Sequence, residues 1–81
     1  MDVFVVELKP EDGNIATLLP RRITEECVYV VQGQLEIKLG EKVYLLNRGD
    51  SIYFEGIHLR RLVAKGEEPL HFITAITPSI F

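Results

Sequence analysis

The chain has 81 residues, a formal net charge of −3 and a pI of about 5.3. A chain this short is expected to form one domain, spanning residues 1–81. The acidic balance argues against direct contact with a nucleic-acid backbone, which a basic surface would bind. No apolar run reaches the ~18 residues of a membrane helix, and the first residues do not resemble a signal peptide. A cytoplasmic protein is therefore expected, and the unpaired Cys27 agrees with that location.

Small size and high apolar content together predict self-association. A chain of this length buries only about 60% of its unfolded surface, while 47% of its residues are hydrophobic. No disulfide or cysteine–histidine cluster adds stability. We therefore expect a homodimer that covers part of the apolar surface.

Period-2 alternation dominates the chain and predicts strands throughout. Residues Gln34 to Leu39 alternate polar and apolar without a fault, as a strand with one wet face does. Val, Ile, Tyr, Phe and Thr are frequent in the other predicted strands, which cover residues 3–8, 27–31, 43–46, 52–54, 59–63 and 70–76.

Glycine marks the turns between these strands. From Gly33 onward the glycines recur every seven to ten residues, each between two apolar runs, and Pro10–Asn14 is expected to be a loop. Short strands at regular spacing indicate an all-β sandwich or barrel.

The segment from Gly13 to Phe81 resembles the cupin superfamily. Six residues separate Glu26 from Gly33 in "ECVYVVQG", as in the family's first motif, and Gly49-Asp50 of "RGDSIYFEG" matches the start of the second. The resemblance implies a cupin double-stranded β-helix, or jelly-roll barrel.

One subfamily is especially similar. The stretches "GDSIYF" and "TPSIF" resemble the C-terminal cupin sensor domains of Xre-type helix-turn-helix transcriptional regulators. That resemblance implies a non-enzymatic domain that binds a small effector or dimerises. Any contact with DNA would be made by a separate helix-turn-helix domain, which these residues do not contain.

The metal ligands of the family are mostly missing. The positions of its paired histidines fall within residues 19–22, "LPRR", and a third histidine position falls on Arg60. Only Glu26 is retained, and one carboxylate does not hold a transition metal. No cofactor is therefore predicted.

Two alternatives stay open. Glu26, His58 and His71 could bind a divalent transition metal, which would make the chain a small cupin dioxygenase, isomerase or decarboxylase. For each histidine a structural or surface role is favoured. The third possibility is a purely structural dimerisation module with a filled barrel.

An inward-pointing Glu26 would need a counter-charge, because a buried carboxylate is otherwise neutralised. Arg21, Arg22 and Arg60 fall where the family's ligands converge, and arginine can pair with a carboxylate through two hydrogen bonds. Two such arginines at the barrel mouth would favour an anionic effector. The competing interpretation makes Arg21 and Arg22 a solvated loop pair.

No catalytic residue is predicted. Cys27 follows Glu26 and so faces the other side of its strand, where packing explains it better than reactivity. Tyr53 either lines the cavity or packs across strands. The predicted ligand-binding residues are Arg22, Glu26, Tyr53, His58 and Arg60.

Overall fold

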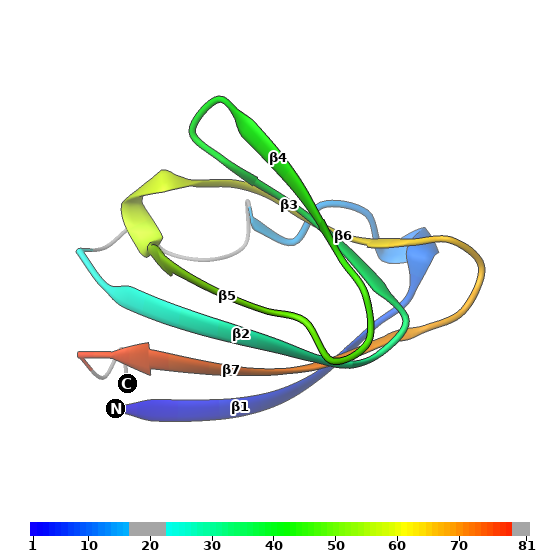
Figure 1. Ribbon diagram of the computed structural model, residues 1–81, viewed down its shortest axis with the longest axis horizontal. Coiled ribbons are helices and arrows are strands. Elements are labelled where there is room, and N and C mark those ends of the chain that lie inside the picture. Colours follow the sequence, from blue (N-terminus) through cyan, green and yellow to red (C-terminus); the bar gives the residue numbers. More distant parts are fainter. Residues whose placement is uncertain (17–22, 79–81) are drawn as a thin grey trace.

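Two antiparallel sheets face one another in the computed structural model, which describes residues 1–16 and 23–78 (Figure 1). The four-stranded sheet has the spatial order β1 (Asp2–Leu8), β7 (Leu70–Thr77), β2 (Glu25–Gln32), β5 (Ser51–Glu55). The three-stranded sheet has the order β4 (Lys42–Leu46), β3 (Gln34–Leu39), β6 (Leu59–Lys65). The predicted all-β jelly roll is confirmed, and so is every predicted strand to within two residues at each end.

Two short 3₁₀ turns interrupt the strands of the described chain. η1 (Pro10–Asp12) lies where the sequence predicts a loop, and η3 (Gly56–His58) joins β5 to β6. The chain thereby crosses between the two sheets at η3, as it also does at the turns after β2 and β4 (Figure 1).

The core lies between the sheets and follows the alternation of the strands. On β3, Leu35 and Ile37 are fully buried, while the alternating Gln34, Glu36 and Lys38 are partly exposed. The inward residues of the opposite sheet meet them, and together the two sheets contribute the buried cluster Leu8, Val28, Val30, Leu35, Ile37, Leu46, Phe54, Leu59, Leu62, Ala64, Leu70 and Phe72.

The Gly49-Asp50 turn ties β4 to the four-stranded sheet. The Asn47 N–H donates to Asp50 Oδ2 at 2.8 Å, so the aspartate caps its own turn. The Gly49 N–H donates to the Val30 carbonyl, and the Val30 N–H donates to the Asp50 carbonyl, both at 2.9 Å. The turn is therefore bound to β2 by backbone hydrogen bonds on both sides.

The outer faces of the two sheets differ in chemistry. On the three-stranded sheet, Glu36 lies 2.9 Å from Arg61 Nε and 3.5 Å from Lys65 Nζ. The hydrogen bond from Arg61 holds the pKa of Glu36 below its usual value. On the four-stranded sheet, the outward side chains are mainly apolar and exposed, among them Val3, Val5, Tyr29, Tyr53 and Ile73.

No helix in the described part of the chain is long and apolar enough to cross a membrane.

A candidate ligand cavity between the sheets

A cavity of about 460 Å³ opens between the two sheets beside β1. Its volume falls within the ~300–1,000 Å³ usual for small-molecule sites. Most of its wall is aliphatic or aromatic. The described residues that line it are Phe4, Val5, Val6, Glu7, Ile15, Glu26, Val28, Leu62, Phe72, Thr74 and Ile76.

Strand alternation places the polar side chains of this wall. Glu26 on β2 has the same parity as the buried Val28 and therefore points inward. Thr74 on β7 has the same parity as Phe72 and Ile76, which are buried. Glu26 pairs in register with Ile76, and Thr74 pairs with Val28. Glu26 and Thr74 are thus diagonal neighbours on one face of adjacent strands.

Asn14 fixes the wall on the side of the three-stranded sheet. Its side-chain oxygen accepts hydrogen bonds from the backbone N–H groups of Ala16 at 3.0 Å and Leu62 at 2.9 Å. Its amide nitrogen donates to the Arg60 carbonyl at 3.3 Å. The Ile15 N–H donates to the Leu62 carbonyl at 3.1 Å. These bonds hold Ile15 against β6, where it forms part of the cavity wall.

Glu26 is a half-buried carboxylate in apolar surroundings. Burial raises its pKa above the ordinary value of 4.5, and a hydrogen bond from Thr24 partly opposes the rise. The Thr24 hydroxyl donates to Glu26 Oε2 at 3.2 Å. Among the described residues, Thr24 is the one side-chain donor to this carboxylate, and Thr24 is itself buried. Glu26 therefore retains acceptor capacity on the cavity side.

Thr74 is the second polar group of the wall. Its side chain is 8% exposed, and its hydroxyl has no hydrogen-bond partner among the described residues. A buried hydroxyl without a partner carries a desolvation cost of about 1–3 kcal/mol. An unsatisfied polar atom in a native interior calls for a physical explanation, and this one belongs to a residue that lines the cavity.

The predicted counter-charges are not brought to Glu26 within the described chain. Arg21 and Arg22 lie outside the described residues. The Arg60 side chain is exposed and donates to the carbonyl oxygens of Ile57 at 2.8 Å and Leu59 at 3.4 Å. The cause is a register shift, because Leu39 pairs with Leu59 and Lys38 with Arg61. Arg60 is the extra residue of this bulge and turns away from the inward row.

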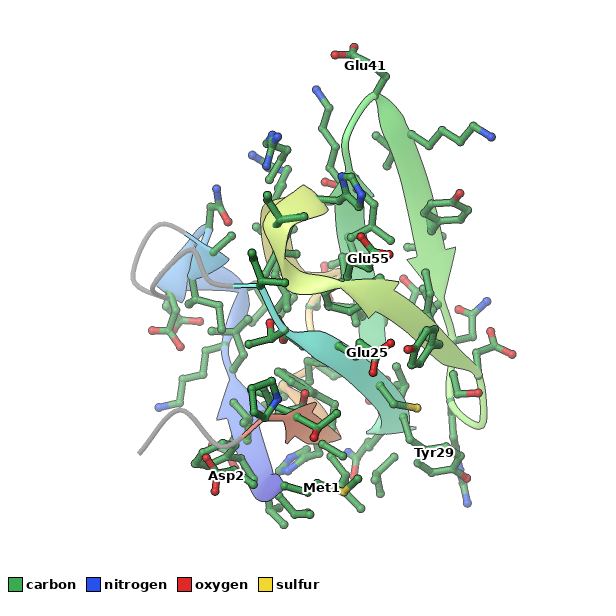
Figure 2. All side chains as sticks on the ribbon, turned by 90° about the vertical axis from the view of Figure 1, so that its left-hand side faces the viewer. Met1, Asp2, Glu25, Tyr29, Glu41 and Glu55 are labelled. Carbon is green, nitrogen blue, oxygen red and sulfur yellow. The ribbon has the colours of Figure 1, made fainter. Side chains whose placement is uncertain are left out.

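Two other predicted ligand-binding residues also lie away from the cavity. Tyr53 is on the outer face of β5 and 63% exposed, and its hydrogen bond to Glu25 raises its pKa. Glu25 lies on β2 next to Glu55 of β5 (Figure 2). His58 belongs to η3 and lies 3.5 Å from Glu55. Of the predicted ligand-binding residues that the structure describes, only Glu26 lies in the cavity wall.

The alternative metal set does not fit this geometry. Glu26 points into the cavity, while His71 is on the outward side of β7, with its Nε2 3.6 Å from Glu7. His58 is exposed on η3. These three side chains lie on different elements and do not converge in the described structure. No group of three or more potential metal ligands occurs among residues 1–16 and 23–78.

Sequence reasoning missed Thr74 and Asn14. Thr74 interrupts an inward row that is otherwise apolar, Leu70, Phe72 and Ile76, and that interruption was a usable signal. Asn14 precedes its partners by up to 48 positions in the chain, so no local pattern could have indicated its contacts.

Two facing antiparallel sheets around one core define the class of small all-β jelly-roll domains. The chain belongs to the cupin family, since the family model described as "Cupin domain" matches residues 4–76. No curated protein sequence matches the chain.

Solved structures share this fold. A cupin protein from Bacteroides fragilis is similar with a TM-score of 0.72 and 18% sequence identity, over 98% of this chain and 68% of that protein. The Fe(II) form of HppE is similar with a TM-score of 0.65 and 25% identity, over 89% of this chain. The chain spans only 40% of the length of HppE.

Proposed function

We propose that this cupin domain binds a small organic molecule between its sheets without a metal ion. The cavity beside β1 carries the proposal, because its size suits such a ligand and its wall is mostly apolar. A purely structural module with a filled barrel would not need this space. Resemblance to the sensor domains of Xre-type regulators supports a sensory role in a cytoplasmic transcriptional regulator.

A neutral fluorescent probe, N-phenyl-1-naphthylamine, tests whether the cavity takes up an apolar molecule. We expect its emission to rise and shift to shorter wavelength when the protein is added. Val6→Trp would fill the cavity from β1, an edge strand, and should abolish the effect. Val43→Trp, on an exposed position of β4, is the matched control and should leave it unchanged. Probe binding that survives Val6→Trp would contradict the proposal.

The likeness to the Fe(II) form of HppE gives the enzymatic alternative some support. It requires a ligand set that the described residues do not assemble. Metal analysis of protein purified without a histidine tag distinguishes the two proposals. We expect well under one transition metal ion per chain, and a full equivalent would favour the enzyme.

The outer face of the four-stranded sheet supports the proposal of a homodimer. Two rows of outward side chains cross all four strands in register: Val3, Ala75, Cys27 and Tyr53, and then Val5, Ile73, Tyr29 and Ser51. Apolar residues dominate both rows, and exposed apolar patches of this kind mark interaction surfaces. A second copy of the chain presents the same face and could cover it by two-fold packing.

A further inference from the structure

The charged groups of the cavity wall share one sign. Among the described residues that line it, the ionisable ones are Glu7 and Glu26, both carboxylates. Glu7 alternates with the inward-facing Val6 and Leu8, so its carboxylate lies on the outer face of β1, 53% exposed and close to His71. Glu26 is the one whose side chain points into the cavity, from β2. An anionic ligand would meet repulsion from the Glu26 carboxylate, so the described wall favours a cation.

Two unfilled hydrogen-bonding positions lie side by side in this wall. The Glu26 carboxylate has one described donor, Thr24, and can accept more. The Thr74 hydroxyl has none and is more than nine-tenths buried. The two residues are diagonal neighbours on the inward face of β2 and β7, a spacing that a long side chain such as glutamate can span.

We propose that the ligand is an amphiphilic amine, with an ammonium head held between Glu26 and Thr74. The inference rests on the proposed ligand-binding function and names the class of ligand. An ammonium group has three donors, enough for the carboxylate and for the lone pairs of the hydroxyl. Its charge compensates the buried acid, which has no cationic neighbour in the described part of the chain. The apolar remainder packs against Phe4, Phe72 and Ile76.

The proposal gives the Thr74 hydroxyl a role in ligand binding, which packing within the sheet does not require. In the free protein its hydroxyl is buried without a partner, a cost that an isosteric apolar side chain would avoid. Thr74→Val should therefore raise the midpoint of thermal unfolding of the ligand-free protein while weakening ligand binding. A residue that served packing only would not show these two opposite effects.

Three probes with one skeleton test the proposal: 2-phenylethylamine, 2-phenylethanol and phenylacetate. Each is titrated into ¹⁵N-labelled protein at neutral pH, and the amide shifts of β2 and β7 give the Kd. The amine should bind about tenfold or more tighter than the alcohol, as a hydrogen bond to a charged group allows. Phenylacetate should bind weakest. Equal Kd values, or tightest binding by phenylacetate, would overturn the proposal.

Variants of Glu26 and Thr74 test which of the two residues produces the preference for amine over alcohol. Glu26→Gln should reduce the preference for amine over alcohol to about threefold or less, because the amide carries no charge. Thr74→Val should weaken amine and alcohol alike, and Thr74→Ser should restore both. Thr77→Val, on the same strand but outside the cavity wall, is the control and should have no effect. An unchanged amine preference in Glu26→Gln would also overturn the proposal.

Failure here is distinguishable from failure of the proposed function. If N-phenyl-1-naphthylamine binds in a manner blocked by Val6→Trp, while the three probes bind equally, the cavity binds ligands but does not select amines. If neither the fluorescent probe nor any of the three compounds binds, both proposals are wrong.

Discussion

Gly33 lies directly against the backbone of Pro69. A Cβ added at Gly33 would stand 2.7 Å from the Pro69 carbonyl oxygen and 3.0 Å from the Leu70 Cα. Gly33 also has a φ of +86°, which side chains rarely adopt. The glycine that ends the first cupin motif is thus required twice, by the turn after β2 and by the close approach of the β6–β7 loop.

Gly33→Ala should lower the free energy of unfolding by about 2–5 kcal/mol. Left-handed backbone costs an alanine roughly 1–2 kcal/mol, and overpacking against rigid backbone adds about 1–3 kcal/mol. Gly49→Ala is the matched control, since its φ is +89° but nothing lies within 4 Å of the added Cβ. Gly49→Ala should therefore lose only the roughly 1–2 kcal/mol that left-handed backbone costs an alanine. Urea unfolding measures both, and equal losses would show that the contact with Pro69 carries no cost.

Asn14→Ala should destabilise the protein by about 1–3 kcal/mol, because it leaves partly buried N–H groups at Ala16 and Leu62 without acceptors. It should also weaken binding of N-phenyl-1-naphthylamine, since Ile15 would no longer be held in the cavity wall. Asn47→Ala is the control: its side-chain oxygen accepts one exposed hydrogen bond, from Gln34. Similar losses in both variants, with unchanged probe binding, would contradict this role of Asn14.

Strand positions were predictable because alternation is a local property of the sequence. Gln34–Leu39 has a faultless period of two, and the structure pairs it with both of its neighbours in the three-stranded sheet. The turns at Gly33, Gly40, Gly49 and Gly66 were predictable for the same reason, since positive φ selects glycine, whereas Gly56 has no positive φ and begins η3. The inward direction of Glu26 also followed from alternation.

The partners of Glu26 were not predictable in this way. Continuous alternation from Leu62 and Ala64 would have turned Arg60 inward, but the bulge at Arg60 breaks that parity. A one-residue bulge leaves no clear mark in a single sequence. The cavity itself arises from the spacing of two sheets, which depends on contacts between distant residues such as Asn14 and Leu62.

Val5→Lys should convert the proposed dimer to a monomer. Val5 is 81% exposed at the edge strand and lies in the outward row with Ile73 and Tyr29. A lysine there would place a charge in each half of a two-fold interface. Light scattering after gel filtration should give twice the chain mass of 9.2 kDa for the unmodified protein, and one chain mass for the variant.

Val43→Lys is the control for this prediction, because Val43 is 58% exposed on the outer face of the other sheet. It should leave the dimer intact. A monomeric unmodified protein, or dissociation by Val43→Lys alone, would contradict the assignment of the interface to the four-stranded sheet.

Glu26→Gln should stabilise the ligand-free protein at neutral pH. Burial raises the pKa of Glu26 above 4.5, so the folded state holds this proton more tightly than the unfolded state. Below pH 4.5 both states are protonated and Glu26 costs no stability. As pH rises through the folded pKa, the ionised carboxylate becomes a growing cost to the stability of the folded state, which glutamine avoids.

Urea unfolding from pH 4 to pH 8 should therefore show a gain in the free energy of unfolding for Glu26→Gln that is absent at pH 4 and reaches a plateau at high pH. Glu25→Gln, on the exposed face of the same strand, should show no such gain. A loss of stability in Glu26→Gln at pH 7 would instead indicate a cation paired with the carboxylate, as the hypothesis of Arg21 or Arg22 requires.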